Sequence, residues 1–313
     1  MIGTENSLTI MRLLHVPGLG PAKVNALLNW CEKSGLSPSV FDVKPEALKD
    51  KLTEEQLNNF QADDRIQALE KELEDKGVYL LCAVDEAYPA TLKAGMKTKA
   101  PPLLYCRGNR KLLSSMSVGF CGSRKASEKG IDTARDCAEQ LAKNDFTIVS
   151  GYAAGVDITT HRAALAAGGT TLFVLPEGIL HFRIKQEIKD VWDWDRVAVV
   201  SQFEPKLPWS VHNAMARNSV ICAIANAMIL IEAGTTGGSI AAGRTCLEMG
   251  KPLFAPVYDG MPESAAGNRL LLKTGARPLG KNRHTNRAAI DRVIESAKAA
   301  ETDEQIEQIR LFG

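Results

Sequence analysis

Short apolar segments alternate with helix-like segments along the middle of this chain, and this alternation limits the fold more than any other feature. The apolar runs occupy 118–121, 147–150, 171–175, 197–201, 228–232 and 252–257. The helix-like stretches between them occupy 127–144, 157–167, 184–194, 211–226 and 239–249. Strands connected by helices pair in parallel, and the helices then cover both faces of the sheet. The sequence therefore predicts an α/β fold with a doubly wound parallel sheet.

Different patterns flank this region. Residues 1–75 are helical in pattern, and the breaker pairs Tyr88-Pro89 and Pro101-Pro102 indicate a connecting segment ahead of the first predicted strand. The last residues are polar and charged, with too few apolar side chains for another domain. We expect a small helical domain at 1–75, a doubly wound domain at 76–280 that folds without it, and a charged tail at 281–313.

Composition limits the partners of the chain. Its 38 Lys and Arg residues nearly balance 37 Asp and Glu residues, so any anion-binding surface must be local. Aromatic residues make up only 6%, which disfavours a groove dominated by stacking. The seven cysteines include no C-x-x-C pair, so neither a zinc site nor a disulfide framework is expected. Without a signal-like start or an apolar run long enough for a bilayer, we expect a cytoplasmic protein that does not contact membranes.

Three glycine-containing turns follow predicted strands, and in a parallel sheet these turns meet at one edge. Glycine allows the backbone to approach a ligand closely, and each turn opens a helix whose first N–H groups attract anions. The dinucleotide fingerprint and the phosphate-binding loop of nucleotide hydrolases are both absent. We therefore expect a phosphate-binding edge for a nucleotide or a nucleic-acid backbone, although tight turns alone would also explain the glycines. Its predicted residues are Gly122, Ser123, Arg124, Lys125, Gly151, Gly155, Gly237, Gly238 and Ser239.

Three titratable residues near this edge leave their roles open. Asp157 and His161 share a helix face at i and i+4, which fits either an acid–base pair or a helix cap beside a packed histidine. Glu232 ends an apolar run and is either catalytic or a partner for backbone N–H groups of the next loop. No nucleophile stands at a recognisable spacing, so no catalytic residue is predicted.

A second turn motif lies near the start of the chain. The residues Pro17-Gly18-Leu19-Gly20-Pro21 stand between two apolar helical stretches, as in a helix–hairpin–helix. The backbone N–H groups around Gly18 and Gly20, together with Lys23, would hold a phosphate without reading bases. A purely structural helical hairpin is the alternative.

A series of motifs runs through the central region in a fixed order. They are Tyr88–Leu92, Pro101–Tyr105, Gly108-Asn109, Gly122–Arg124, Val149–Asp157, His161, Gly168–Thr171, Ala216–Asn218, Glu232-Ala233, Gly238-Ser239 and Gly275-Ala276. These motifs, in this order, resemble those of the DprA/Smf family of bacterial DNA-processing proteins. The resemblance implies an extended Rossmann-like domain that binds single-stranded DNA without a cofactor, forms a homodimer and hands DNA to a RecA-type recombinase during natural transformation. It also fits an appended N-terminal helical domain of the SAM-like kind.

Individual site residues follow from the resemblance. Arg124 matches the arginine that grips a DNA phosphate, and Arg217-Asn218 match the start of the family's R-N-R signature. Ser219 replaces the second arginine of that signature, and residues 176–183 depart from the family's G-C-G-L-D…Y-P stretch. Lys185 is a candidate for the lysine that follows this stretch. These departures fit a diverged paralogue.

The resulting hypothesis is a non-enzymatic single-stranded DNA-binding protein that protects DNA and loads recombinase in transformation. The alternative is a nucleotide sensor or nucleotide-hydrolysing enzyme on the same fold, with a possible role in phage defence. Related nucleotide hydrolases carry a P-G-G-x-G-T-x-x-E block, whereas this chain has Ala233-Gly234-Thr235-Thr236-Gly237-Gly238-Ser239. That difference favours DNA binding.

The end of the sequence carries one further motif. Gln308-Ile309-Arg310-Leu311-Phe312 resembles the Q-L-x-L-F peptide with which bacterial proteins dock onto the replication sliding clamp. Leu311 and Phe312 would fill an apolar pocket while Gln308 orients the peptide. The alternative is that Leu311 and Phe312 cap the last helix against the domain.

Overall fold

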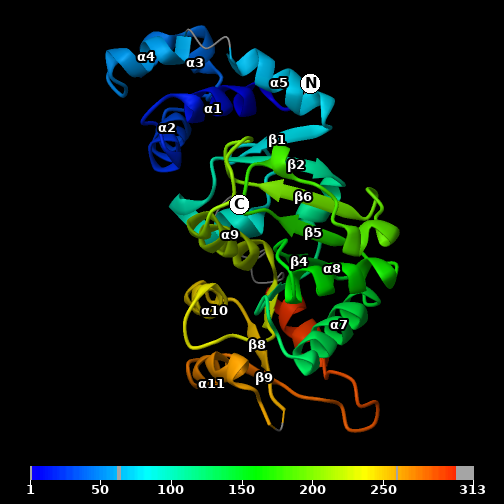
Figure 1. Cartoon of the computed structure of the whole chain (residues 1–313). Coiled ribbons are helices and arrows are strands. Elements are labelled where there is room, and N and C mark those ends of the chain that lie inside the picture. The colour runs from blue at the N-terminus through cyan, green and yellow to red at the C-terminus, as the bar shows by residue number, and fades with distance from the viewer. Residues whose placement is uncertain (1, 62–64, 259, 301–313) are drawn as a thin grey trace.

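The computed structural model describes residues 2–61, 65–258 and 260–300. Within them a nine-stranded sheet has the order β1-β2-β6-β5-β4-β3-β7-β8-β9 (Figure 1). All neighbours from β6 to β9 in this order are parallel, whereas β1 and β2 add an antiparallel edge. The strands are β1 (Val78–Cys82), β2 (Leu103–Gly108), β3 (Ser117–Cys121), β4 (Thr147–Ser150), β5 (Thr171–Val174), β6 (Val197–Ser201), β7 (Ala227–Leu230), β8 (Leu253–Pro256) and β9 (Arg277–Leu279).

The strand order confirms the predicted doubly wound fold. From β3 the chain builds outward through β4, β5 and β6, then crosses back to place β7, β8 and β9 on the other side of β3. Ligands of open α/β sheets bind outside the carboxyl ends of the strands where the order reverses. The loops after β3, β4 and β7 therefore meet at the most favourable position for a site.

Helices cover both faces of this sheet. One face packs on α7 (Glu128–Ala142) and α8 (Val156–Ala166), and Phe120 and Ile148 point into this layer. Their neighbours Cys121 and Val149 point the opposite way, as the period of two along a strand requires. The opposite face packs on α6 (Ala90–Met96), α9 (Val211–Ile224), α10 (Gly238–Glu248) and α11 (Ala266–Lys273).

Two parts of the chain differ from the sequence prediction. The segment 76–116, expected as a connection, contains β1 and β2. The helix expected at 184–194 is absent, and only the short 3-10 helix η5 (Gln186–Val191) forms there. Phe182, Trp192 and Trp194 in this segment pack on one another. Phe182 also packs on Tyr152 in the turn after β4, and Trp192 packs on Phe173 of β5. Burying these large rings outweighs the weak helical pattern of the segment.

The N-terminal helices are not separate from the sheet. They lie beside β1 at the antiparallel edge (Figure 1), and their buried side chains form one cluster with Leu80, Leu103 and Val199 of the sheet. The Leu80 N–H also donates to the Ile2 carbonyl over 2.7 Å. The boundary proposed at residue 75 therefore crosses a shared core. These helices are α1 (Glu5–His15), α2 (Pro21–Lys33), α3 (Val40–Val43), α4 (Glu54–Gln61) and α5 (Arg65–Asp75), with the 3-10 helix η1 (Pro45–Leu48) between α3 and α4.

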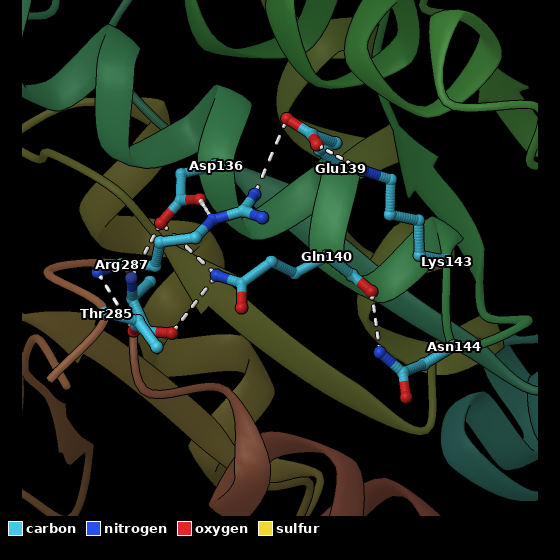
Figure 2. A network of polar contacts seen from close by, with 8 residues as sticks. Asp136, Glu139, Gln140, Lys143, Asn144, Thr285 and Arg287 are labelled. Atoms are coloured by element: carbon cyan, nitrogen blue, oxygen red, sulfur yellow. Dashed lines mark hydrogen bonds and ion pairs between the residues drawn. The ribbon is translucent and has the colours of Figure 1, made fainter.

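The beginning of the expected charged tail is folded. Figure 2 shows Arg287 lying against α7, where its Nε donates to Asp136 over 2.5 Å and its Nη2 lies 3.5 Å from Glu139. The backbone N–H of Ala288 also donates to Asp136 over 2.6 Å. Residues 291–300 are helical, and Val293 is buried in the same layer as α7. Pairing with α7 neutralises charge in a segment whose composition suggested solvated chain.

The helices in the described parts of the chain include none with the length and hydropathy of a membrane-spanning segment. Among the same residues, no three side chains of the His, Cys, Asp or Glu type lie close enough to hold a metal ion together.

Candidate anion-binding site

A cavity of about 440 Å³ lies at the carboxyl edge of the sheet, where the strand order reverses. The loops after β3, β4 and β7 contribute to its wall, and the first half of α9 completes it. The structure thus brings together residues that are distant in sequence. The cavity is lined by Gly122, Ser123, Arg124, Ala153, Asp157, Val211, Ala214, Met215, Arg217, Asn218, Gly234, Thr236, Gly237, Gly238 and Ser239.

Arg217 is the buried cation of this cavity. The residue is only 5% exposed, and its Nη1 lies 3.8 Å from the Asp157 carboxylate. Its Nε has no hydrogen-bond partner among the described residues. A buried donor without an acceptor costs roughly 1–3 kcal/mol, and more when it belongs to a charged group. Arg217 lines the cavity, so its positive charge favours an anion that enters there.

Gly151 makes room for Arg217. A Cβ atom at position 151 would lie 1.6 Å from Nη1 of Arg217, so the guanidinium fits only because glycine stands there. Gly155 has φ +79°, and a Cβ there would lie 2.7 Å from the Arg124 carbonyl oxygen. Neither glycine is among the residues that line the cavity. Both shape its wall by permitting close packing, which differs from the predicted direct contact with a ligand.

The start of α10 presents free backbone donors to the same cavity. Gly237 is its N-cap residue with φ +97°, no side chain caps the helix, and its first turn contains no acidic residue. Asn218 donates to the Gly238 carbonyl over 3.3 Å and so connects α9 to this turn. Uncapped N–H groups and the positive end of the helix dipole favour an anion here.

Further cations surround the mouth of the cavity. Arg124 and Lys125 are exposed, although only Arg124 lines the cavity. Lys185 donates to the Tyr152 carbonyl over 2.5 Å, and its Nζ lies 4.2 Å from the centre of the Tyr152 ring. Burial lowers the pKa of Lys185, and the positive charge of Arg124 contributes in the same direction. Lys185 is not among the residues that line the cavity.

The structure favours a packing role for His161 and a structural role for Asp157. Asp157 is not the predicted helix cap, because Gly155 is the N-cap of α8 and no side chain among the described residues caps that helix. Asp157 accepts from the Ser150 hydroxyl over 2.9 Å and from the Ala153 N–H over 3.1 Å, so it holds the turn after β4. His161 is fully buried, and its Nε2 donates to the Gly151 carbonyl over 2.7 Å. Its Nδ1 lies 2.6 Å from the Thr171 hydroxyl, which donates to the Ile148 carbonyl over 2.7 Å. His161 thereby supports the cavity wall from behind, whereas Asp157 forms part of the wall itself.

Acid is expected to destabilise the fold through His161. Burial lowers its pKa from 6.5 to about 3, so between these values the unfolded chain binds one more proton than the folded chain. This contribution to stability is complete above pH 6.5 and falls by about 1.4 kcal/mol per pH unit below it. Urea unfolding of the wild type and of His161→Gln across this range should give a shallower pH dependence for the variant. The exposed residue His212, replaced by Gln, is the control, and equal slopes for wild type and His161→Gln would contradict the prediction.

Glu232 is buried and fully engaged in hydrogen bonds. Its carboxylate accepts from the Ser127 N–H and hydroxyl over 2.9 and 2.5 Å, from the Tyr258 hydroxyl over 2.5 Å and from the Ser264 hydroxyl over 2.9 Å. Burial raises its pKa, but these hydrogen bonds lower the pKa further, to below its ordinary value. Glu232 does not line the cavity. The carboxylate therefore has a structural role, but it holds the backbone N–H of Ser127 in the loop after β3 and not, as predicted, N–H groups of the loop that follows Glu232.

The N-terminal turn lies apart from this cavity. Gly18 has φ +78°, Gly20 is the N-cap of α2, and Lys23 is exposed in the first turn of that helix. No side chain caps α2 and its first turn contains no acidic residue. Figure 1 shows α2 in the N-terminal helical layer and α10 in another part of the molecule. The structure therefore separates the predicted phosphate-binding residues into two groups.

Sequence reasoning missed Trp209 at the mouth of the cavity. The Arg124 guanidinium lies 5.5 Å from the centre of its ring, and the residue is 46% exposed. The available signal was a tryptophan next to Pro208 in a loop, just before the helix that carries Arg217. The predicted clamp-docking residues Gln308, Leu311 and Phe312 lie outside the described residues.

Comparison with known proteins gives consistent matches. The family model of DNA recombination-mediator protein A matches residues 79–288. Protein Smf of Escherichia coli is 33% identical over 207 residues, which cover 65% of this chain and 54% of that protein, so the match spans about half of Smf. The DNA processing protein DprA of Streptococcus pneumoniae is 32% identical over 200 residues, covering 62% of this chain and 68% of that protein.

Solved structures agree with this assignment. The crystal structure of DNA processing protein A from Streptococcus pneumoniae superposes with a TM-score of 0.73 at 25% identity, covering 89% of this chain and 95% of that chain. DNA processing protein A from Helicobacter pylori has the same fold, with a TM-score of 0.56 at 24% identity over 72% of this chain and 96% of that chain. With its doubly wound sheet and a family match over more than half its length, the chain belongs to the DNA recombination-mediator protein A family, the DprA/Smf proteins.

Proposed function

We propose that this chain binds single-stranded DNA by its phosphates at the carboxyl edge of the sheet and acts without catalysis in DNA processing during transformation. The observation that carries the proposal is the buried Arg217, whose Nε has no acceptor among the described residues. The helix start at Gly237-Gly238 and the exposed Arg124 add donors and charge beside it. The Helicobacter pylori relative is described as having a single-stranded DNA binding mode, which supports the choice of ligand.

A free nucleotide is the competing ligand for the same cavity. A nucleotide-hydrolysing enzyme would need a carboxylate free to act on its substrate. Glu232, the candidate for that role, accepts hydrogen bonds from Ser127, Tyr258 and Ser264 and lies outside the cavity lining. His161 is buried behind the wall. These contacts favour a binding protein over a hydrolase, and the titration below separates DNA binding from a nucleotide sensor used in phage defence.

Titration of the two ligand classes distinguishes these functions. We expect a labelled oligonucleotide to bind in fluorescence anisotropy, with an affinity that falls steeply as salt rises because bound counterions are released. ATP and GMP are expected to compete only weakly. Tight nucleotide binding without oligonucleotide binding would overturn the proposal.

Arg124→Ala is expected to weaken oligonucleotide binding about tenfold at low salt, because it removes one charge-assisted contact with a phosphate. The plot of log affinity against log salt should become shallower by about 0.7, the value for one phosphate of a single strand. Arg135→Ala is the matched control, since Arg135 is exposed on α7 and pairs with Asp132. An unchanged salt slope in Arg124→Ala would remove Arg124 from the DNA path.

The cellular role that we propose is inferred from membership of the DprA/Smf family. We infer that the chain acts as a homodimer in the cytoplasm, protects incoming DNA and hands it to a RecA-type recombinase. The turn at Gly18, Gly20 and Lys23 would hold a second stretch of the DNA backbone. Docking to a replication sliding clamp through Gln308, Leu311 and Phe312 is part of the same proposal.

A further inference from the structure

Three large apolar side chains are exposed close together beside the cationic cavity. Trp209, Val211 and Met215 remain 46%, 64% and 48% exposed, respectively. Val211 and Met215 stand at i and i+4 of α9, which places them on one face of the helix. A cluster of exposed apolar side chains in an otherwise well-buried domain indicates a contact surface.

This apolar surface adjoins the proposed phosphate site. Val211 and Met215 line the cavity together with Arg217. Arg124 lines the cavity as well, and its guanidinium lies 5.5 Å from the centre of the Trp209 ring. A ligand that places an anion in the cavity and an apolar group beside it would therefore contact both surfaces.

The backbone that carries Trp209 is held in place on both sides. Ser210 accepts from the Asn213 N–H over 3.0 Å and caps α9. On the other side, the Leu207 N–H donates to the Glu204 carbonyl over 2.9 Å, and the Gly178 N–H donates to the Leu207 carbonyl over 2.8 Å. An aromatic ring on a fixed backbone loses little conformational freedom when a flat ligand stacks on it.

We propose that Trp209, with Val211 and Met215 beside it, is the platform on which a nucleobase of bound single-stranded DNA stacks. The inference rests on the proposed function, because the phosphates next to that base would occupy the cavity at Arg217. In a single strand every base stands one sugar away from a phosphate, and the short separation of Arg124 from the Trp209 ring matches this arrangement. Stacking accepts all four bases, since each has an aromatic face.

A stacking platform at Trp209 is compatible with the low aromatic content of the chain. A content of 6% aromatic residues disfavours a binding groove built mainly from stacked bases. One exposed tryptophan at the mouth of a phosphate cavity adds base contact without such a groove. The expected result is a preference for DNA with bases over a bare sugar–phosphate backbone, together with little preference among bases.

The test compares a thymidine oligonucleotide with an abasic oligonucleotide of equal length, using the full chain and anisotropy. The wild type should bind the thymidine strand about tenfold more tightly than the abasic strand. Trp209→Ala should lower the affinity for the thymidine strand by about the same factor and leave abasic binding and the salt slope unchanged. Trp209→Phe should restore most of the difference in affinity between the thymidine strand and the abasic strand. Leu36→Ala removes an exposed apolar side chain of the N-terminal helical region and serves as the control.

Two outcomes would overturn the platform. If Trp209→Ala leaves the affinity for the thymidine strand unchanged, the apolar surface serves another partner, such as a protein. If the variant weakens both strands equally, Trp209 acts through Arg124 and not through a base. Failure of the wild type to bind either strand would instead refute the proposed function itself.

Discussion

Replacing Glu232 by alanine is expected to lower the free energy of unfolding by about 3 kcal/mol. The carboxylate accepts from Ser127, Tyr258 and Ser264, and the alanine variant would leave the partly buried Ser127 N–H without its acceptor. Ser127 is also the N-cap of α7, accepting from the Gly130 N–H over 3.1 Å. Loss of the carboxylate therefore loosens the start of α7 and the loop that carries Tyr258.

Urea unfolding at neutral pH measures this loss. Glu232→Gln should cost less, because its amide oxygen still accepts hydrogen bonds. Glu248→Ala removes an exposed carboxylate on α10 and should change stability by less than about 0.5 kcal/mol. Near neutral pH, the folded fraction of Glu232→Ala should still bind an oligonucleotide. A variant as stable as the wild type would contradict the structural role and return Glu232 to the candidates for catalysis.

The pH dependence of the stability that Glu232 contributes gives a second measurement of its role. Because its folded-state pKa lies below the ordinary value of 4.5, its contribution to stability is complete above that value and is lost as the pH falls through the folded-state pKa. The alanine variant has no such contribution to lose. The stability difference between wild type and variant should therefore narrow in acid.

The sheet was largely predictable because buried parallel strands leave a strong local signal. Five of the predicted apolar runs fall within one residue of β3, β4, β5, β6 and β8 at each end, and the run at 228–232 is shifted by one to two residues from β7. The loops that follow β3 and β7, together with the start of α10, carry most of the predicted site residues that line the cavity. Such features depend on local pattern and on the rule that ligands bind at the carboxyl edge.

Other features depend on contacts between distant residues and leave no local signal. Arg287 pairs with Asp136 although 151 positions separate them. Glu232 holds Ser127 from 105 positions away. That the Nε of Arg217 has no acceptor within the described part of the chain emerges only when Gly151 and Asp157 are placed around it. Periodicity and motif spacing report the role of a residue within its own segment, so these partners had to come from the structure.

The domain boundary near residue 75 also depends on contacts between distant residues, which a local sequence pattern does not reveal. The composition changes near residue 75, and this change predicted a sheet that folds without the preceding helices. In the structure, α1 packs on β1, and buried side chains such as Phe41 and Leu73 share one core with Leu80 and Leu103. A change of composition marks a change of secondary structure, whereas the independence of a domain depends on how much apolar surface it shares with its neighbour.

Removal of residues 1–75 is therefore expected to yield an insoluble or molten protein, in contrast to the sequence prediction. The truncation exposes the side of β1 and β2 that carries Leu80 and Leu103, and it removes the ion pair of 2.7 Å between Lys206 and Glu72. A long apolar surface beside a sheet edge promotes aggregation. Solubility, binding of a hydrophobic dye and the cooperativity of thermal unfolding measure the outcome.

Co-expression supplies the control for this truncation. If residues 1–75 and 76–313 are produced as two chains, the shared core should re-form, and the two fragments should purify together as a soluble complex. Leu80→Asp in the larger fragment should abolish that association, because a charge would then be buried among the helices. A soluble fragment 76–313 that unfolds cooperatively on its own would show that the N-terminal helices are an independent domain, because the sheet would then be stable without the apolar contacts of α1 and its neighbours.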